Sequence, residues 1–444
     1  MTKKKLRHNE VTGVQSLGPA RIPSPMSYCR FLPESSVVDI HFTGELDNFS
    51  GGTADYRFEL AGPREHIYFD SSKTKCAIVT CGGLCPGIND VIRAIVMEAH
   101  HNYNVAATLG IRFGLQGFIP EYGHNIQELT PENVSDIHMF GGTILGSSRG
   151  PQPEDEIVDA LERMNVNVLF MIGGDGTMKA ADKIVREISR RKLKISVVGI
   201  PKTIDNDINF VFQSFGFDTA VEKATESIQC AHIESKGVFN GIGMVKLMGR
   251  ESGFIAAQAS LAYKEVNFVF VPEAPFELYG PNGFLAALEK RMALRQHAVI
   301  VVSEGAGQDL CDVSGEKDPS GNPVLGDVCA VLREAIKTHF KEKKIPLTLK
   351  FIDPSYIIRS VPANANDRVY CGFLGQHAVH AAMAGKTGMV VNKIRGHYVY
   401  LPLSLVVKER RKINIDSDYW RSVLESTGQQ TYGHIFKVKS KNKS

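Results

Sequence analysis

The sequence predicts an α/β protein made of two parallel-sheet lobes with an N-terminal extension. From Lys75 onward, short apolar runs alternate with amphipathic stretches, which is typical of folds in which helices cover parallel strands. The chain has 444 residues, of which 43% are hydrophobic and 22% charged, and this suits two or three globular domains. A disordered chain, a collagen-like chain and a coiled coil are excluded by the same composition.

The elements are expected in the following order. Residues 1–74 are rich in Gly, Pro and Ser and are interpreted as the extension, with strands near Ser36–Phe42 and Tyr56–Leu60. Later strands are expected at Cys76–Thr80, Val166–Ile172, Ser196–Ile200, Gly241–Met248, Val266–Val271, Ala298–Ser303 and Leu347–Ile352. Helices are expected at Asn89–His100, Met178–Arg190, Ala220–His232, Gly253–Ala262, Phe284–Arg295, Gly326–Lys341 and Gly372–Ala384. A hairpin at Thr387–Val407 and a helix at Ser417–Gln429, which carries the only tryptophan, complete the order.

Charge and composition argue against several classes of function. The net charge is 51 − 48 = +3, and the first and last eight residues each carry four Lys or Arg and no acid, so residues 9–436 carry 3 − 8 = −5. A globular body of negative net charge argues against nucleic-acid binding. No apolar run reaches the about 18 residues of a membrane helix. Residues 1–30 show no secretory signal.

The eight cysteines indicate a reducing compartment. They form no Cys-x-x-Cys pair and show no His spacing typical of zinc sites. In a long chain without a signal, this pattern is typical of reduced thiols. We therefore expect a cytoplasmic protein without membrane or nucleic-acid partners.

Two glycine-rich motifs follow predicted strands, where ligands of parallel α/β folds bind. Gly82–Asn89 opens a helix, and its small residues let backbone amides approach a phosphate, although a tight structural turn explains it equally well. Gly173–Thr177 leaves one carboxylate among glycines, which suits Mg²⁺ held beside a nucleotide. The structural alternative is an aspartate that caps a helix.

A third motif, Pro201–Asp207, combines two carboxylates with a hydroxyl and a lysine. One carboxylate would accept the proton of an alcohol, and the cation would offset charge on a phosphoryl group in transfer. The structural alternative is an Asx-rich turn. Met248–Arg250, Ser303–Gly305 and Tyr356–Arg359 also follow strands, and the last of them presents a hydroxyl and a guanidinium to a phosphate.

In this chain order, the motifs resemble those of the 6-phosphofructokinase family over about residues 76–370. Gly-Gly-Asp-Gly-Thr also occurs in NAD kinases and diacylglycerol kinases, and Thr-Ile-Asp-Asn-Asp separates the families. The resemblance implies a phosphofructokinase-like fold with two discontinuous lobes. Residues 75–215, completed by about 360–405, would bind nucleotide, and residues 216–359, completed by about 406–430, would bind sugar phosphate. Residues 431–444 would form a basic tail.

The resemblance also implies a role for each site residue. ATP contacts are expected at Gly83, Arg149, Gly150, Gly174, Gly176 and Thr177. Asp175 matches the magnesium-associated aspartate, and Asp205 matches the general base that accepts the proton of the sugar 1-hydroxyl. Around the transferred phosphoryl group, the expected residues are Thr203, Asp207, Arg250 and Lys202. Contacts with fructose 6-phosphate are expected at Thr203, Ile204, Asp205, Met248, Gly249, Arg250, Glu304, Tyr356 and Arg359.

Positions 176 and 202 bear on the phosphoryl donor. Family members that use pyrophosphate typically carry Asp at the first and Lys at the second, whereas many bacterial ATP enzymes carry Gly at both. This chain combines Gly176 with Lys202. A glycine leaves room where the α-phosphate of ATP passes, and a lysine is compatible with either donor, so ATP is predicted and pyrophosphate is the alternative.

The predicted function is therefore transfer of the ATP γ-phosphoryl group to the 1-hydroxyl of fructose 6-phosphate, with Mg²⁺ as cofactor. A remote alternative is a non-catalytic regulatory paralogue, which would be expected to lack Asp175 or Asp205. By resemblance, a homo-oligomer (dimer or tetramer) is expected. Where the bacterial pattern has an arginine supplied by a neighbouring subunit, this chain has Asn240–Gly243, so subunit sharing of the site stays open.

Overall fold

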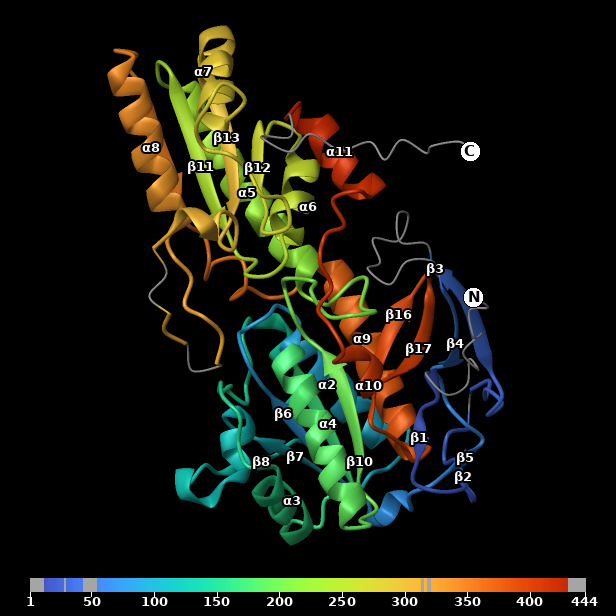
Figure 1. The fold of residues 1–444 in the computed structure, drawn as a ribbon. Helices are drawn as coiled ribbons and strands as arrows, with labels where there is room; N and C mark the ends of the chain where they lie inside the picture. The colour runs from blue at the N-terminus through green and yellow to red at the C-terminus, as the bar shows by residue number, and fades with distance from the viewer. Residues whose placement is uncertain (1–11, 28, 43–53, 313–314, 318–320, 430–444) are drawn as a thin grey trace, which may run out of the picture. The chain divides into compact units, whose positions relative to one another are not determined.

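The computed structural model describes residues 12–27, 29–42, 54–312, 315–317 and 321–429 (Figure 1). The predicted basic tail at 431–444 and the basic N-terminal octet lie outside the described residues. The chain separates into two compact units. One contains the described residues up to Ala220, those of 317–322, and Tyr356–Arg411. The other contains Val221 to 316, Pro323–Ser355 and the described residues from Lys412 on.

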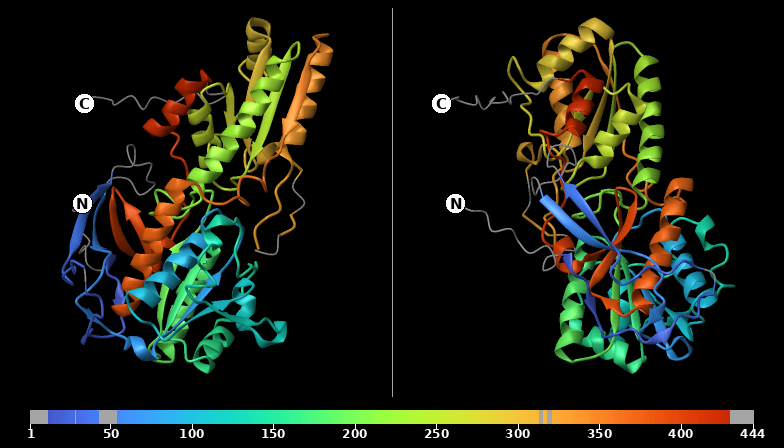
Figure 2. Two further views of the ribbon diagram at one scale, coloured as in Figure 1. Left: turned by 180° about the vertical axis from the view of Figure 1, so that it is seen from behind. Right: turned by 90° about the vertical axis from the view of Figure 1, so that its right-hand side faces the viewer.

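Nine described strands form the sheet of the first unit (Figures 1 and 2). From edge to edge they are β3 (Val37–Phe42), β4 (Ala54–Leu60), β17 (His397–Pro402), β16 (Met389–Ile394), β10 (Ser196–Pro201), β9 (Val168–Gly173), β6 (Lys75–Thr80), β7 (Ala107–Ile111) and β8 (Ile126–Glu128). The five strands from β16 to β7 are parallel, and the strands outside them pair antiparallel. The predicted C-terminal hairpin is confirmed as β16–β17.

Helices cover the central strands, which agrees with the largely apolar sequences of β6, β9 and β10. The helices of this unit are α2 (Ile88–His101), α3 (Glu154–Arg163), α4 (Asp175–Arg190), the start of α5 (Phe217–Lys236), α9 (Ala365–Met383) and α10 (Leu403–Val406). Alternate residues of β6 and β9, such as Val79 and Met171, share a core with α3 and α4. Helices α2 and α9 pack against each other, and α9 contacts β10 and β16. Each residue of β9 and β10 is buried, as in sheets covered on both faces.

The predicted N-terminal extension contributes strands to this sheet. Val399 of β17 pairs with Leu60 of β4, and β3 pairs with β4 in turn. Two short pairs lie beside the sheet, between β1 (Gln15–Ser16) and β15 (Lys386–Thr387) and between β2 (Ile22–Pro23) and β5 (His66–Ile67). Arg64, whose side chain is 2% exposed, donates to Glu59 at 2.9 Å.

The second unit has a smaller, all-parallel sheet. Its described strands, in spatial order, are β12 (Phe268–Phe270), β13 (His297–Ser303), β11 (Gly241–Leu247) and β14 (Thr348–Ile352). Its helices, besides the rest of α5, are α6 (Phe254–Tyr263), α7 (Phe284–Arg295), α8 (Val328–Glu342) and α11 (Asp418–Thr427). Helix α11 packs on α6 (Figure 1). Its Trp420 is buried.

The predicted α/β class is confirmed, and most predicted elements agree with the structure to within a few residues. Strand β7 and helix α3 were not predicted. Strand β7 carries Thr108 and Gly110, which break its apolar run, and α3 is only ten residues long with six charged side chains. The chain passes to the second unit within α5 and returns to the first unit for the described residues of 317–322 and again from Tyr356 to Arg411. Tyr356 and Arg359 therefore belong to the first unit.

Candidate active site

The carboxyl ends of β6, β9 and β10 lie at one edge of the first sheet. Thr80 pairs with Ile172, and Pro201 pairs with Gly173, so the three strands end in register. Beyond the strands, the Lys202 amide donates to the Gly173 carbonyl at 2.9 Å. The three predicted motifs of this unit are therefore neighbours in space, as expected at the edge where parallel α/β sheets bind ligands.

The loop after β6 meets the predicted arginines. The Lys202 Nζ donates to the Gly83 carbonyl at 2.5 Å, which ties this loop to the one after β10. A Cβ at position 83 would lie 3.4 Å from Arg359 Nη1 and 3.7 Å from Arg149 Nη2. Three groups from distant parts of the sequence thus converge on one glycine, and two of them are guanidiniums. Gly150, beside Arg149, has a φ of 95°.

Helix α4 begins inside the Gly-Gly-Asp-Gly-Thr motif. Its N-cap is Gly174, which offers no side chain to cap the first turn, and Asp175 is its first residue. The amide of Thr177, a buried residue, donates to the Gly174 carbonyl at 2.9 Å. Anions bind at such helix N-termini because amide groups point outward there and the helix dipole is positive.

Two glycines of this motif, Gly173 and Gly176, differ in how much space surrounds them. A Cβ at Gly173 would overlap the Thr177 side chain, so packing within the protein requires that glycine. A Cβ at Gly176 would have no protein atom within 4 Å. Gly176 lies in the first turn of a helix, where other residues are accepted more readily than glycine. Neither packing nor helix propensity therefore accounts for a glycine at position 176.

The loop after β10 holds a hydroxyl between two aspartates. The Asp205 amide donates to Thr203 Oγ1 at 3.1 Å, and that hydroxyl donates to Asp207 Oδ1 at 3.0 Å. Asn206 has a φ of 55°, and its Oδ1 accepts from the Ser214 amide at 3.0 Å, eight residues further on, so this hydrogen bond ties the loop to a later segment and is not an Asx turn. The side chain of Ile204 is buried, so a ligand would meet the backbone of that residue.

Burial acts on two ionisable groups of this loop. It raises the pKa of Asp207, and the nearby Asp175 carboxylate raises it further, whereas Arg410 and the Thr203 hydroxyl lower it. Burial lowers the pKa of Lys202, which is 5% exposed. Perturbed groups of opposite charge at a strand end are typical of functional sites.

Asp175 and Asp207 share a cation. Arg410 Nε donates to Asp175 Oδ2 at 3.2 Å, and its Nη1 lies 3.9 Å from Asp207 Oδ2. Lys179 Nζ also donates to Asp175, at 2.8 Å. Sequence reasoning missed Arg410, which stands in the charged run Lys408–Lys412 and carries no local signal of a site.

The residues present fit a magnesium ion. Carboxylate oxygens are the ligands that Mg²⁺ prefers, and it is commonly bound through one or two carboxylates together with substrate phosphates. Asp175 and Asp207 supply two such groups, and Arg410 shows that a positive charge is accommodated there. In the described part of the chain, no group of three or more His, Cys, Asp or Glu gathers to hold a metal.

The second unit brings its own predicted residues together. The Ser303 Oγ donates to the Gly249 carbonyl at 2.7 Å, and a Cβ at Gly305 would overlap the Arg250 carbonyl. The loops after β11 and β13 are thus in backbone contact, which places Met248–Arg250 beside Glu304. The Arg250 Nη2 donates to the Pro323 carbonyl.

Tyr356 and Arg359 form a pair within the first unit. The Arg359 Cζ lies 4.9 Å from the centroid of the Tyr356 ring, and Tyr356 is 72% exposed. This cation–π contact holds the guanidinium beside the Tyr356 hydroxyl, so that a planar donor group and a hydroxyl lie together.

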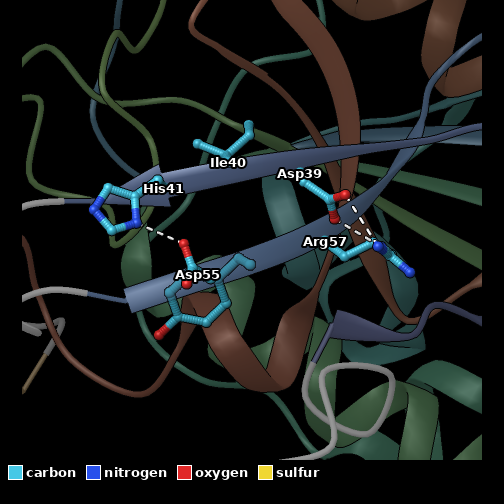
Figure 3. Close-up of a pocket in the computed structure, with 6 residues that line it drawn as sticks. Asp39, Ile40, His41, Asp55 and Arg57 are labelled. Carbon is cyan, nitrogen blue, oxygen red and sulfur yellow. Dashed lines mark hydrogen bonds and ion pairs between the residues drawn. The ribbon is translucent and has the colours of Figure 1, made fainter.

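A pocket elsewhere on the first unit contains none of the predicted site residues. It lies along β3 and β4 and is lined by Asp39, Ile40, His41, Asp55, Tyr56 and Arg57 (Figure 3). Its charged groups pair with each other across the hairpin. His41 Nδ1 lies 2.5 Å from Asp55 Oδ1, and Arg57 Nε donates to Asp39 at 2.6 Å.

Comparisons with known proteins identify the family. Residues 75–382 match the family model described as phosphofructokinase, so the chain belongs to the phosphofructokinase family. The chain is 52% identical over 382 residues to the ATP-dependent 6-phosphofructokinase of Borreliella burgdorferi, covering 84% of this chain and 86% of that one. It is 46% identical over 372 residues to the ATP-dependent 6-phosphofructokinase of Trypanosoma brucei brucei, covering 83% and 76%.

A solved structure shares the fold. The pyrophosphate-dependent phosphofructokinase of Marinobacter aquaeolei superimposes with a TM-score of 0.65 at 20% identity, covering 82% of this chain and 93% of that one. At this identity the likeness shows the fold alone. Separately, no helix in the described residues has the length and apolar character needed to span a membrane.

Proposed function

We propose that this protein is an ATP-dependent 6-phosphofructokinase, which transfers the γ-phosphoryl group of ATP to the 1-hydroxyl of fructose 6-phosphate and yields fructose 1,6-bisphosphate and ADP. The observation that carries the choice of donor is the open space at Gly176, which neither packing nor helix propensity requires. Relatives that share 44–52% identity with most of this chain bear the name of this activity, which supports the same reading.

In this proposal, the polyphosphate lies against the loops after β6 and β9. The glycines at 83, 174 and 176 let backbone amides approach it, and Arg149 supplies positive charge. Asp175 and Asp207 would hold Mg²⁺, which when bound neutralises charge on the phosphates. Lys202 joins the two loops through the Gly83 carbonyl and adds a buried cation.

Asp205 serves as the general base. It accepts the proton of the sugar 1-hydroxyl as the hydroxyl oxygen attacks the γ-phosphorus, and ADP leaves. Thr203 supports this geometry, because its hydroxyl accepts from the Asp205 amide and donates to Asp207. Arg250 would offset charge on the transferred group, and Glu304, Met248 and Gly249 would bind the sugar. Tyr356 and Arg359 would bind its 6-phosphate.

The second candidate uses pyrophosphate as donor. Lys202 keeps it open, because pyrophosphate-using members typically carry lysine at that position and a lysine is compatible with either donor. The two candidates differ in one measurement: the initial rate with fructose 6-phosphate and Mg²⁺, with ATP or pyrophosphate as the sole donor. We expect ATP to support the faster rate. A faster rate with pyrophosphate would reverse the assignment, and no rate with either would contradict both.

We further propose that the protein acts as a homo-oligomer, a dimer or tetramer, in the cytoplasm. The family resemblance supports the assembly, and the free thiols of the eight cysteines support a reducing compartment. Light scattering coupled to size-exclusion chromatography measures the assembly, and a monomer at working concentration would contradict it.

A further inference from the structure

One arginine outside every predicted motif contacts both carboxylates of the proposed metal–nucleotide site. Arg410 donates to Asp175 at 3.2 Å through Nε and approaches Asp207 to 3.9 Å through Nη1. The Asp175 and Asp207 side chains are 10% and 11% exposed, and that of Arg410 is 27% exposed. These charges therefore meet in a partly dry place, where electrostatic interactions are stronger than at a free surface.

The backbone fixes the position of this arginine. Arg410 forms an antiparallel bridge with Ile208, and the Arg411 amide donates to the Asp207 carbonyl at 2.9 Å. The Arg411 guanidinium donates to the Asn206 and Phe212 carbonyls at 3.2 and 3.4 Å. The backbone of Arg410 is thus held in register with the loop that carries Asp207. This backbone pairing places the Arg410 side chain beside the two carboxylates.

Two close carboxylates repel each other unless a cation lies between them. A guanidinium meets this need with a single, delocalised charge, whereas Mg²⁺ brings two charges and closer contact. A cation already present must be displaced before another can bind the same oxygens. The Arg410 contact therefore weakens the binding of a metal ion at these oxygens. The affinity is lowered most for a metal ion without a polyphosphate, because no other contact then offsets the displacement of Arg410.

We propose that Arg410 is the resident counter-ion of the Asp175–Asp207 pair and a positioning residue of the site. It holds the two carboxylates in place while the site is empty, and it competes with a bare divalent cation for their oxygens. Metal then binds tightly only with its polyphosphate, whose contacts with the glycine loops offset the displacement of Arg410. This inference rests on the proposed function, because it takes Asp175 and Asp207 to face the metal–nucleotide.

The test is binding of Mn²⁺ to the full-length protein without nucleotide, measured as free Mn²⁺ by electron paramagnetic resonance. Arg410→Met removes the charge while keeping an extended side chain, and it is expected to bind Mn²⁺ at least about tenfold more tightly than wild type, the size of one lost charge-assisted hydrogen bond. Arg410→Lys keeps a charge and is expected to stay within about threefold of wild type. Adding Asp175→Asn to Arg410→Met should abolish the gain.

Lys183→Met is the matched control, because it removes an exposed charge from helix α4 of the same unit without a contact to either carboxylate. We expect it to leave Mn²⁺ affinity unchanged. If Arg410→Met does not fold, Arg410→Gln tests the same loss of charge. Unchanged or weaker Mn²⁺ binding in folded Arg410→Met or Arg410→Gln overturns the inference. Absence of fructose 6-phosphate phosphorylation by wild type is a separate result, and it would instead overturn the proposed function.

Discussion

Replacing Gly176 by Asp should lower the use of ATP without lowering the stability of the protein. A Cβ at this position has no protein atom within 4 Å, so the fold has room for the side chain. Position 176 is the second residue of α4, where a carboxylate interacts favourably with the helix dipole by about 0.3–1 kcal/mol. We therefore expect the free energy of unfolding to stay unchanged or to rise slightly.

ATP use should fall severely in the same variant. A carboxylate about 5 Å from one phosphate charge, at an effective dielectric constant of about 20, is repelled by about 3 kcal/mol. This corresponds to a loss of about 150-fold in kcat/KM for ATP, in addition to any steric effect. Gly176→Asn is the matched control, because it has the same size without the charge. The ratio between the two variants measures the electrostatic part.

The assay is a coupled measurement of ADP formation with varied ATP and saturating fructose 6-phosphate, beside chemical unfolding of each variant. The reasoning fails if Gly176→Asp keeps kcat/KM for ATP within about threefold of wild type. It also fails if the lost activity is matched by a comparable loss of stability. No gain of pyrophosphate activity is expected, because new catalysis requires positioning as well as space.

Other outcomes follow from the same structure. Asp205→Asn should lower kcat by about 10²–10⁴-fold with little change in fructose 6-phosphate binding. Asp159→Asn, an exposed aspartate of α3, is its control, and equal losses in the two would refute the base assignment. Arg359→Ala should raise KM for fructose 6-phosphate by about 10- to 150-fold and spare that for ATP; an unchanged KM for fructose 6-phosphate would refute the assignment of Arg359 to the 6-phosphate. Burial lowers the pKa of His380 to about 3, below the value of about 6.5 in the unfolded chain. The unfolded state therefore binds the proton first, and the free energy of unfolding falls as pH drops below about 6.5. At pH 5 this costs about 2 kcal/mol, and His380→Gln should flatten the acid side of the Tm profile.

Strands and loops could be predicted where the residues that define them are adjacent in the sequence. The strands that became β9 and β10 are largely apolar runs that end in glycine or proline, and the structure buries them fully. The residues of the Thr203–Asp207 loop stand within five positions, so their grouping could be predicted before any fold was known. Hydrogen bonds between neighbours then agree with that grouping.

Features that depend on distant pairing could not be predicted. Nothing near Leu60 indicates that its strand pairs with Val399, because edge pairing is set by the whole sheet. In the sequence, Arg410 cannot be distinguished from other residues of a charged, solvent-exposed segment. Its position beside Asp175 depends on the backbone bridge to Ile208. The predicted end of the second lobe at 359 also differs from the division seen, which assigns Tyr356 onward to the first unit, because the sequence does not mark where a chain returns.

The pairing of β4 with β17 has a consequence for folding during synthesis on the ribosome. Leu60 leaves the ribosome 339 residues before Val399, its partner in the sheet. At about 5–20 residues per second, the N-terminal hairpin waits on the order of 20–70 s for the strand that receives it. Its edge meanwhile offers unpaired backbone groups to other chains. The sheet of the first unit therefore cannot be completed until β17 has been synthesised, and nascent chains stalled before β17 should depend on chaperones far more than the folded protein does.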